Sequence, residues 1–76
     1  MLYHGRIEIA PAVCSGKPVI RGSRILVTSS LSQLAAGKSF DAVRKGFPGL
    51  THEDIKAAIE FAKQSIEATG LAALRD

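Results

Sequence analysis

The sequence has a single cysteine, Cys14, among its 76 residues, so no framework of disulfide bonds can stabilise the fold. A chain of this length lies near the lower size limit for domains that fold without disulfide bonds or a bound metal. We therefore expect a second copy of the chain to supply additional buried area, which makes a homodimer the expected state.

Long apolar stretches are absent as well. The uninterrupted apolar runs are only a few residues long, whereas about 20 residues are needed to span a bilayer. Met1–Arg6 lacks the charged region and the apolar core of about 7–15 residues that mark a signal peptide. Together with the lone cysteine, these features predict a cytoplasmic protein that makes no membrane contact.

Negative charge is scarce in the first part of the chain. Residues 1–46 contain seven lysines and arginines but only two aspartates and glutamates. Residues 47–76 contain three lysines and arginines and five aspartates and glutamates. The net charge is +3, and the positive excess lies entirely in the first segment. An anionic partner such as DNA should therefore meet residues 1–46.

A small β element is expected over about residues 6–27. Arg6–Ile9 alternates polar and apolar residues and is followed by Pro11, which is typical of a strand at the edge of a sheet. Its free edge is where we expect a second copy to pair. Cys14–Pro18 contains the glycine and proline of a turn.

Gly22 and Ser23 separate two runs of β-favouring residues, which predicts a two-residue hairpin turn of type II′. The register of this hairpin would place Val19 opposite Leu26, Ile20 opposite Ile25 and Arg21 opposite Arg24. Like charges that face each other across a hairpin repel, and an anion bound between the two arginines would reverse the repulsion. In the alternative, both side chains extend into water over their own aliphatic stems.

Three helices are expected over about residues 28–69. The first should run from an N-cap at Thr28 to a stop at Gly37. Ser39 can cap a short second helix, which should end at residues 46–49.

The third helix has the clearest start. Thr51 and Asp54 have the spacing of a capping box, and Leu50 can pack on Ile55 across the first turn. The apolar face of this helix should consist of Ile55, Ala58, Ile59, Ala62 and Ile66. Beyond Gly70, the apolar tail at residues 70–76 carries Leu71 and Leu74, which we expect to contact a partner.

These elements predict a single domain, residues 1–76, of the α+β class and mostly α. In it, a short N-terminal strand and a β-hairpin precede a three-helix bundle that resembles a helix-turn-helix. A small α+β domain with no role in DNA binding fits the same pattern. Phe40, Phe47 and Phe61 fall on apolar helix faces, so we assign them to the core rather than to a base-stacking platform.

The candidate DNA-binding residues are cations of the first segment: Lys17, Arg21, Arg24, Lys38, Arg44 and Lys45. The third helix is a poorer candidate, because Glu53 and Asp54 in its first turn would repel phosphate. The chain also has no asparagine, so the bidentate contact of that side chain with adenine cannot form.

No pattern in the sequence indicates catalysis. His4, Cys14 and His52 lack the spacing of metal ligands, and Gly16-Lys17 lacks the flanking residues of a phosphate-binding loop. The sequence shows no pair of carboxylates and no Ser/His/Asp grouping that would suit a reaction. We therefore expect no enzymatic activity, no cofactor, no metal and no small-molecule substrate.

Cys14–Ile25 reads Cys-Ser-Gly-Lys-Pro-Val-Ile-Arg-Gly-Ser-Arg-Ile and resembles the bacterial family known as domain of unknown function 433. Members of that family carry a cysteine-x-glycine-lysine-proline turn followed by isoleucine-arginine-glycine-threonine-arginine-isoleucine. Ser23 stands where threonine is usual and keeps the hydroxyl group. The similarity continues through Leu34–Ser39 and Phe47–Ile55 to about Ala62, and so covers most of the chain.

This resemblance implies an antitoxin of a type II toxin–antitoxin pair, with a homeodomain-like helix-turn-helix fold and a PIN-like nuclease encoded nearby. It leads us to expect a protein that neutralises a PIN-like ribonuclease toxin and represses its own operon by binding DNA. Two alternatives stay open. One is a stand-alone DNA-binding transcriptional regulator, and the other is a protein-interaction module that does not bind DNA.

Overall fold

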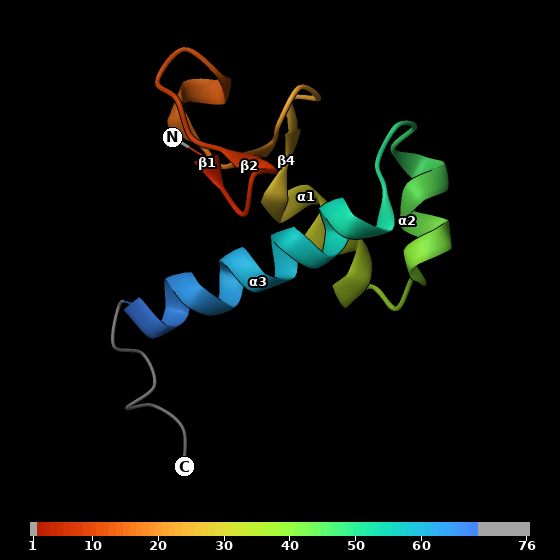
Figure 1. The fold of residues 1–76 in the computed structure, drawn as a ribbon. Helices are drawn as coiled ribbons and strands as arrows, with labels where there is room; N and C mark the ends of the chain where they lie inside the picture. Colours follow the sequence, from red (N-terminus) through yellow and green to blue (C-terminus); the bar gives the residue numbers. More distant parts are fainter. Residues whose placement is uncertain (1, 69–76) are drawn as a thin grey trace.

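In the computed structural model, which describes residues 2–68, a four-stranded antiparallel sheet leads into three helices (Figure 1). The strands are β1 (Leu2–Tyr3), β2 (Ile7–Glu8), β3 (Val19–Ile20) and β4 (Ile25–Leu26), with a short 3-10 turn, η1 (Cys14–Gly16), between β2 and β3. The helices are α1 (Val27–Ala35), α2 (Phe40–Gly46) and α3 (His52–Ala68). The α+β class with a predominance of helix is thus confirmed.

The strand expected at residues 6–9 is not an edge of the sheet, contrary to the prediction. The strand order is β1-β2-β3-β4, and Ile7 pairs with Tyr3 on one side and with Ile20 on the other. The additional strand forms because the chain reverses at His4 and Gly5, which both adopt left-handed backbone conformations with φ of 56° and 68°. The backbone of β2 is therefore not open to a second copy.

The hairpin of β3 and β4 has the expected register but a different turn. Ile20 pairs with Ile25 as predicted, and Val19 with Leu26. The connection is a four-residue loop, residues 21–24, in which the amide of Ser23 donates to the carbonyl of Ile20 at 3.1 Å.

Gly22, with φ of 79°, is the third residue of this turn and gives it the shape of type II rather than II′. Arg24 also lies in the left-handed region, with φ of 60°. Arg21 and Arg24 therefore belong to the loop and do not form a cross-strand pair, so the predicted repulsion between facing arginines does not apply.

The start of α1 differs from the prediction, whereas its end agrees. The N-cap position is Leu26, and no side chain caps the helix, so Thr28 is not the cap. The chain enters α1 directly from β4, and the amide of Val27 donates instead to the carbonyl of Pro18 at 3.0 Å. At the other end, Gly37 has φ of 92° and its amide bonds to Leu34 at 2.9 Å, as expected for a helix stop.

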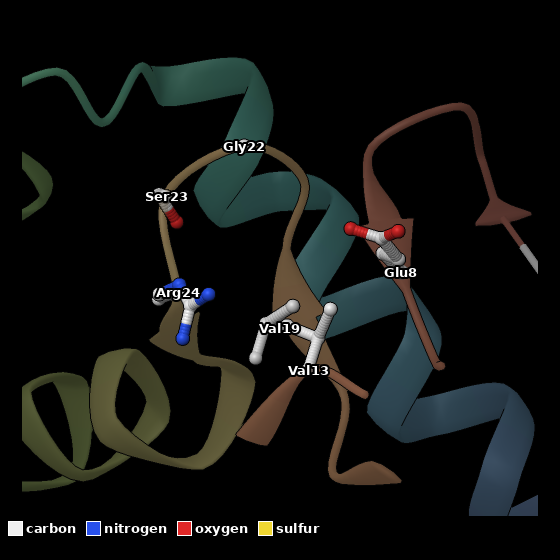
Figure 2. A pocket seen from close by; sticks show the side chains of 6 residues that line it. All are labelled: Glu8, Val13, Val19, Gly22, Ser23 and Arg24. Atoms are coloured by element: carbon white, nitrogen blue, oxygen red, sulfur yellow. The ribbon is translucent and has the colours of Figure 1, made fainter. Parts of the chain in front are cut away.

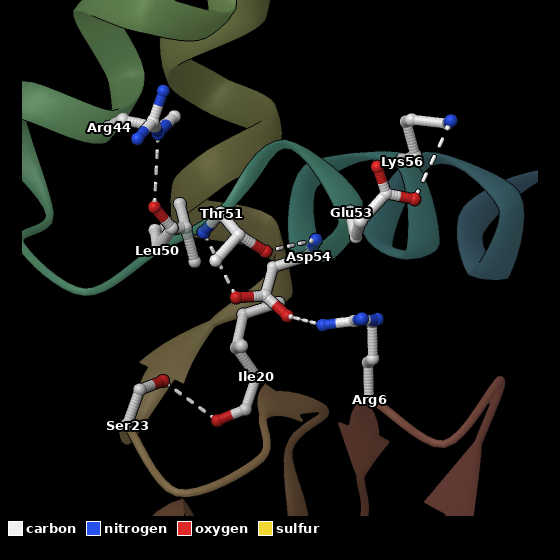
Figure 3. A network of polar contacts seen from close by, with 9 residues as sticks. All are labelled: Arg6, Ile20, Ser23, Arg44, Leu50, Thr51, Glu53, Asp54 and Lys56. Carbon is white, nitrogen blue, oxygen red and sulfur yellow. Dashed lines mark hydrogen bonds and ion pairs between the residues drawn. The ribbon is translucent and has the colours of Figure 1, made fainter.

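Both later helices begin at the predicted caps. The Ser39 hydroxyl accepts a hydrogen bond from the amide of Ala42 at 3.2 Å. At α3 the amide of Asp54 donates to Thr51 Oγ1 at 3.1 Å, and the amide of Thr51 donates to Asp54 Oδ2 at 3.0 Å (Figure 3). The two bonds form the capping box that the spacing predicts.

The core lies where the inner face of the sheet and the three helices meet. Its buried members are Ile7, Ile20, Val27, Val43, Leu50, Ile55, Ala57 and Ala58. Packed against this cluster, and only partly buried, are Tyr3 and the three phenylalanines assigned to the core from the sequence, Phe40, Phe47 and Phe61. That assignment is confirmed. No helix within residues 2–68 is long and apolar enough to cross a membrane.

The predicted apolar face of α3 is buried only along its first half. Ile55 and Ala58 are fully buried, but Ile59 is 40% exposed and Ile66 is 51% exposed. The C-terminal half of α3 extends past α1 (Figure 1). The side of the helix that faces the sheet carries Phe61, whose ring centroid lies 5.1 Å from that of Tyr3 in β1. The tail residues Leu71 and Leu74 lie outside the described residues.

Candidate nucleic-acid-binding surface

All six predicted DNA-binding cations have exposed side chains. Arg21 and Arg24 lie in the loop between β3 and β4, and Lys17 precedes β3 at its other end. Lys38 lies in the turn between α1 and α2, and Arg44 and Lys45 lie in the last turn of α2.

The structure does not bring these six cations into one cluster. The β3–β4 loop and the α1–α2 turn lie toward opposite ends of α1, a helix of nine residues, or about 13 Å at 1.5 Å per residue (Figure 1). An anion that contacts Arg21 and Lys38 together must therefore be extended. A polyanion such as a nucleic acid meets this requirement, and a single phosphate does not.

Arg44 differs from the other five because it is engaged within the protein. Its Nε donates to the carbonyl of Leu50 at 3.2 Å (Figure 3). Its Nη1 lies 3.4 Å from Asp41 Oδ1. The side chain therefore connects α2 to the segment that leads into α3. Among residues 2–68, the remaining five, Lys17, Arg21, Arg24, Lys38 and Lys45, make no ion pair.

Arg6, which contributes to the positive excess of the first segment, is also neutralised. Its Nη1 lies 2.9 Å from Asp54 Oδ1, and Asp54 is buried, with 9% of its surface exposed (Figure 3). The expectation that Asp54 repels phosphate at the helix surface is therefore wrong. The carboxylate is turned inward, with one oxygen on the guanidinium and the other on the helix cap.

Four of the exposed charges of α3 form two ion pairs along the helix. Lys56 lies 3.6 Å from Glu53, and Lys63 lies 3.6 Å from Glu60. Each pair is three residues apart and faces solvent, which is the ordinary spacing of helix ion pairs. Glu53 is the carboxylate that remains exposed in the first turn, so α3 offers little to a polyanion.

Asp41 links α2 to α3 through His52. The ring Nε2 of His52 lies 3.1 Å from Asp41 Oδ1. The ring of Phe40 packs edge-on against the His52 ring, with 5.6 Å between the two ring centroids. The hydrogen bond from His52 and then the charge of that ring lower the pKa of the Asp41 carboxyl from its ordinary value of 3.8. Sequence spacing gives no sign of this contact.

Two hollows were not predicted from the sequence. A cleft of about 280 Å³ lies beside the β3–β4 loop and is lined by Glu8, Val13, Val19, Gly22, Ser23 and Arg24 (Figure 2). An apolar groove of about 460 Å³ lies between the first strands and the end of α3, lined by Tyr3, Ile9, Phe61, Gln64, Ser65 and Ala68. The alternation of β2 does place Glu8 on the opposite face from Ile7, but the segment that forms the far wall of the cleft has no regular pattern.

The comparisons with known proteins point to one family. The family model described as protein of unknown function (DUF433) matches residues 7–62. A crystal structure of a DUF433 member protein from Anabaena variabilis superposes with a TM-score of 0.76 at 30% sequence identity. The match covers 95% of this chain and 71% of the Anabaena chain. No curated protein matches the sequence.

Proposed function

The chain belongs to the DUF433 family, and from that premise we propose that it is an antitoxin-like regulator. It binds the phosphate backbone of DNA with cations of its N-terminal half, and it neutralises a PIN-like ribonuclease whose operon it represses. One observation carries the DNA-binding part. Five exposed cations in the first 46 residues have no acidic partner among residues 2–68, whereas Lys56 and Lys63, the two lysines of α3, each have one.

The helical part supports a helix-turn-helix interpretation in a modified form. The three helices pack against one another and are joined by short turns. In an ordinary helix-turn-helix protein the last helix enters the major groove, but the ion pairs along α3 and the exposed Glu53 do not suit that role. We therefore assign the phosphate contacts to the β3–β4 loop with Lys17, and to Lys38 and Lys45.

The toxin-binding part follows from the resemblance to antitoxins, and the apolar surface of the protein supports a protein partner. Most of the side chains that line the groove beside α3 are apolar: Tyr3, Ile9, Phe61 and Ala68. Ile59 and Ile66 are large apolar residues at the surface of the same half of α3. These features also favour the second candidate function, a protein-interaction module that does not bind DNA.

DNA binding is tested with a promoter fragment and two charge-matched double variants. Lys38→Ala with Lys45→Ala removes two lysines without acidic partners, and Lys56→Ala with Lys63→Ala removes two that are paired. Each phosphate contact contributes about −0.9 to the slope of log K against log salt, so the first pair should reduce the slope by about 2 per bound chain. The second pair should change it by less than about 1.

Fluorescence anisotropy at several salt concentrations measures both slopes. Equal slopes for the two double variants would exclude phosphate contacts at Lys38 and Lys45. If the unaltered chain shows no salt-dependent binding to the promoter fragment, the DNA-binding part of the proposal is excluded and the protein-interaction module is the function that stands. Co-purification with the product of the adjacent gene tests the toxin, and its absence favours a stand-alone DNA-binding regulator.

A further inference from the structure

The cleft beside the β3–β4 loop lies on the outer face of the sheet, away from the helices. Glu8, Val19 and Leu26 are cross-strand neighbours on this face, whereas Ile7 and Ile20 point into the core. Val19 is fully buried although it does not belong to the helix-facing core. Val13 from the segment before η1 lies beside it in the cleft (Figure 2) and, being partly exposed, is the apolar side chain that a ligand can reach.

Two opposite charges flank this pair of valines. Glu8 lies on one side of the valines and Arg24 on the other (Figure 2). Neither side chain makes an ion pair among residues 2–68, with each other or with a third residue. Glu8 repels an anion that enters the cleft, so a ligand that fills the cleft is favoured when it carries both signs of charge.

Arg24, which lines the cleft, and the two residues that follow its lining residue Val13 are held in a demanding backbone conformation. Cys14, Ser15 and Arg24 have φ of 49°, 58° and 60°, in the left-handed region that residues other than glycine rarely adopt. The two strained segments are joined, because Cys14 Sγ donates to the carbonyl of Arg24 at 3.8 Å. Such strain persists only where surrounding contacts impose it, and it is found at ligand clamps more often than elsewhere. The cleft is therefore formed in the free protein.

We propose that this cleft binds an extended segment of a partner protein. A small apolar side chain of the segment lies against Val13, a basic side chain pairs with Glu8, and an acidic side chain pairs with Arg24. A polypeptide is favoured over a small molecule because the cleft is open and holds only about 280 Å³. A small ligand would keep much of its surface in water, whereas a polypeptide can continue along the surface on both sides.

This site goes beyond the proposed function and does not require DNA binding. Only Arg24 belongs to both surfaces, so a bound segment and DNA should compete for it. Glu8, Val13 and Val19 have no part in the phosphate contacts, which allows the two proposals to be tested separately.

The test uses capped peptides with the central sequence Lys-Val-Asp or its reverse, Asp-Val-Lys, because the direction of the segment is not fixed. Amide chemical shifts of the labelled chain are followed during titration. One of the two peptides should shift the amides around Val19 and Ser23 with a dissociation constant of about 1 mM or tighter. Versions with glutamine for lysine or asparagine for aspartate should bind about tenfold more weakly.

Three variants assign the binding to the cleft. Glu8→Gln and Arg24→Asn should each weaken the preferred peptide about tenfold, and asparagine is chosen because it tolerates the left-handed backbone. Arg21→Ala is the matched control, since Arg21 lies in the same loop but does not line the cleft, and it should leave the affinity unchanged.

The proposal is overturned if neither peptide binds, if Glu8→Gln has no effect, or if a peptide with only acidic side chains binds equally well. DNA binding by Glu8→Gln should be at least as tight as that of the unaltered chain, because the variant removes a negative charge and no phosphate contact, so failure of this site is distinct from failure of the DNA-binding proposal.

Discussion

Arg6 Nη1 lies 2.9 Å from Asp54 Oδ1, and this contact joins the turn between β1 and β2 to the first turn of α3. The two residues are 48 positions apart, and the carboxylate that receives the guanidinium also completes the helix cap. The buried carboxylate of Asp54 thus contacts both the turn before β2 and the cap of α3, and fixes the position of the sheet relative to the helix. This explains how a sheet of two-residue strands keeps a defined position on α3.

Removing Arg6 should destabilise the fold more than removing another exposed arginine. Arg6→Ala leaves Asp54 buried with one oxygen unpaired, which costs about 1–3 kcal/mol. Arg21→Ala removes the same side chain from a loop where it has no ion pair among residues 2–68, and should change stability by less than about 0.5 kcal/mol. Urea denaturation followed by circular dichroism measures both. Equal midpoints for the two variants would show that the contact does not support the fold.

The contact between Asp41 and His52 should stabilise the folded state by an amount that decreases at acid pH. Because the pKa of Asp41 is lowered in the folded state, the contribution is present above the ordinary value of 3.8 and is lost as the pH falls through the lower folded value. Asp41→Asn should therefore lower the melting temperature at about pH 5, and the difference from the unaltered chain should shrink below pH 3.8. Glu67→Gln is the control, because Glu67 makes no ion pair among residues 2–68. A constant difference across the acid range would contradict the assignment.

The hydroxyl of Ser23 should matter for the β3–β4 loop, and its replacement by threonine should not. Ser23 Oγ donates to the carbonyl of Ile20 at 2.7 Å and accepts from the amide of Ile25 at 3.0 Å, so one hydroxyl spans the end of the hairpin. Ser23→Ala loses both bonds and should cost about 1–3 kcal/mol, since each is worth about 0.5–1.5 kcal/mol. Ser23→Thr keeps them and should unfold at nearly the same denaturant concentration. A large loss in the threonine variant would show that the side chain is limited by space rather than by hydrogen bonding.

What the sequence predicted well depends on signals within a few residues. Ser39 and the pair Thr51 and Asp54 were recognisable as caps because the donor and acceptor are three positions apart. The register of β3 and β4 followed from matching the apolar residues on either side of Gly22. In each case the partner lies on the same short segment, so local chemistry determines the outcome.

What the sequence did not predict depends on contacts between distant segments. β1 has only two residues and no alternating pattern, so nothing marked it as the strand that covers the edge of β2. The buried side of α3 is determined by where the sheet lies, and for this reason Ile59 and Ile66 are exposed although they share a helix face with Ile55. The cleft at Glu8 and Arg24 has the same origin, because its walls come from three separate segments.

The loop arginines should contribute to DNA binding through charge without supporting the fold. Arg21→Ala combined with Arg24→Asn removes two cations that make no ion pair among residues 2–68, while Ser23 and its hydrogen bonds stay in place. The slope of log K against log salt for promoter DNA should fall by about 2 per bound chain, or by 3 to 4 if the chain binds as a dimer, at about −0.9 for each contact. The urea midpoint should stay close to that of the unaltered chain, because no bond of the turn uses either guanidinium. If the double variant keeps the full salt slope and loses only the protein partner, the β3–β4 loop faces that partner and the phosphate contacts lie on Lys38 and Lys45.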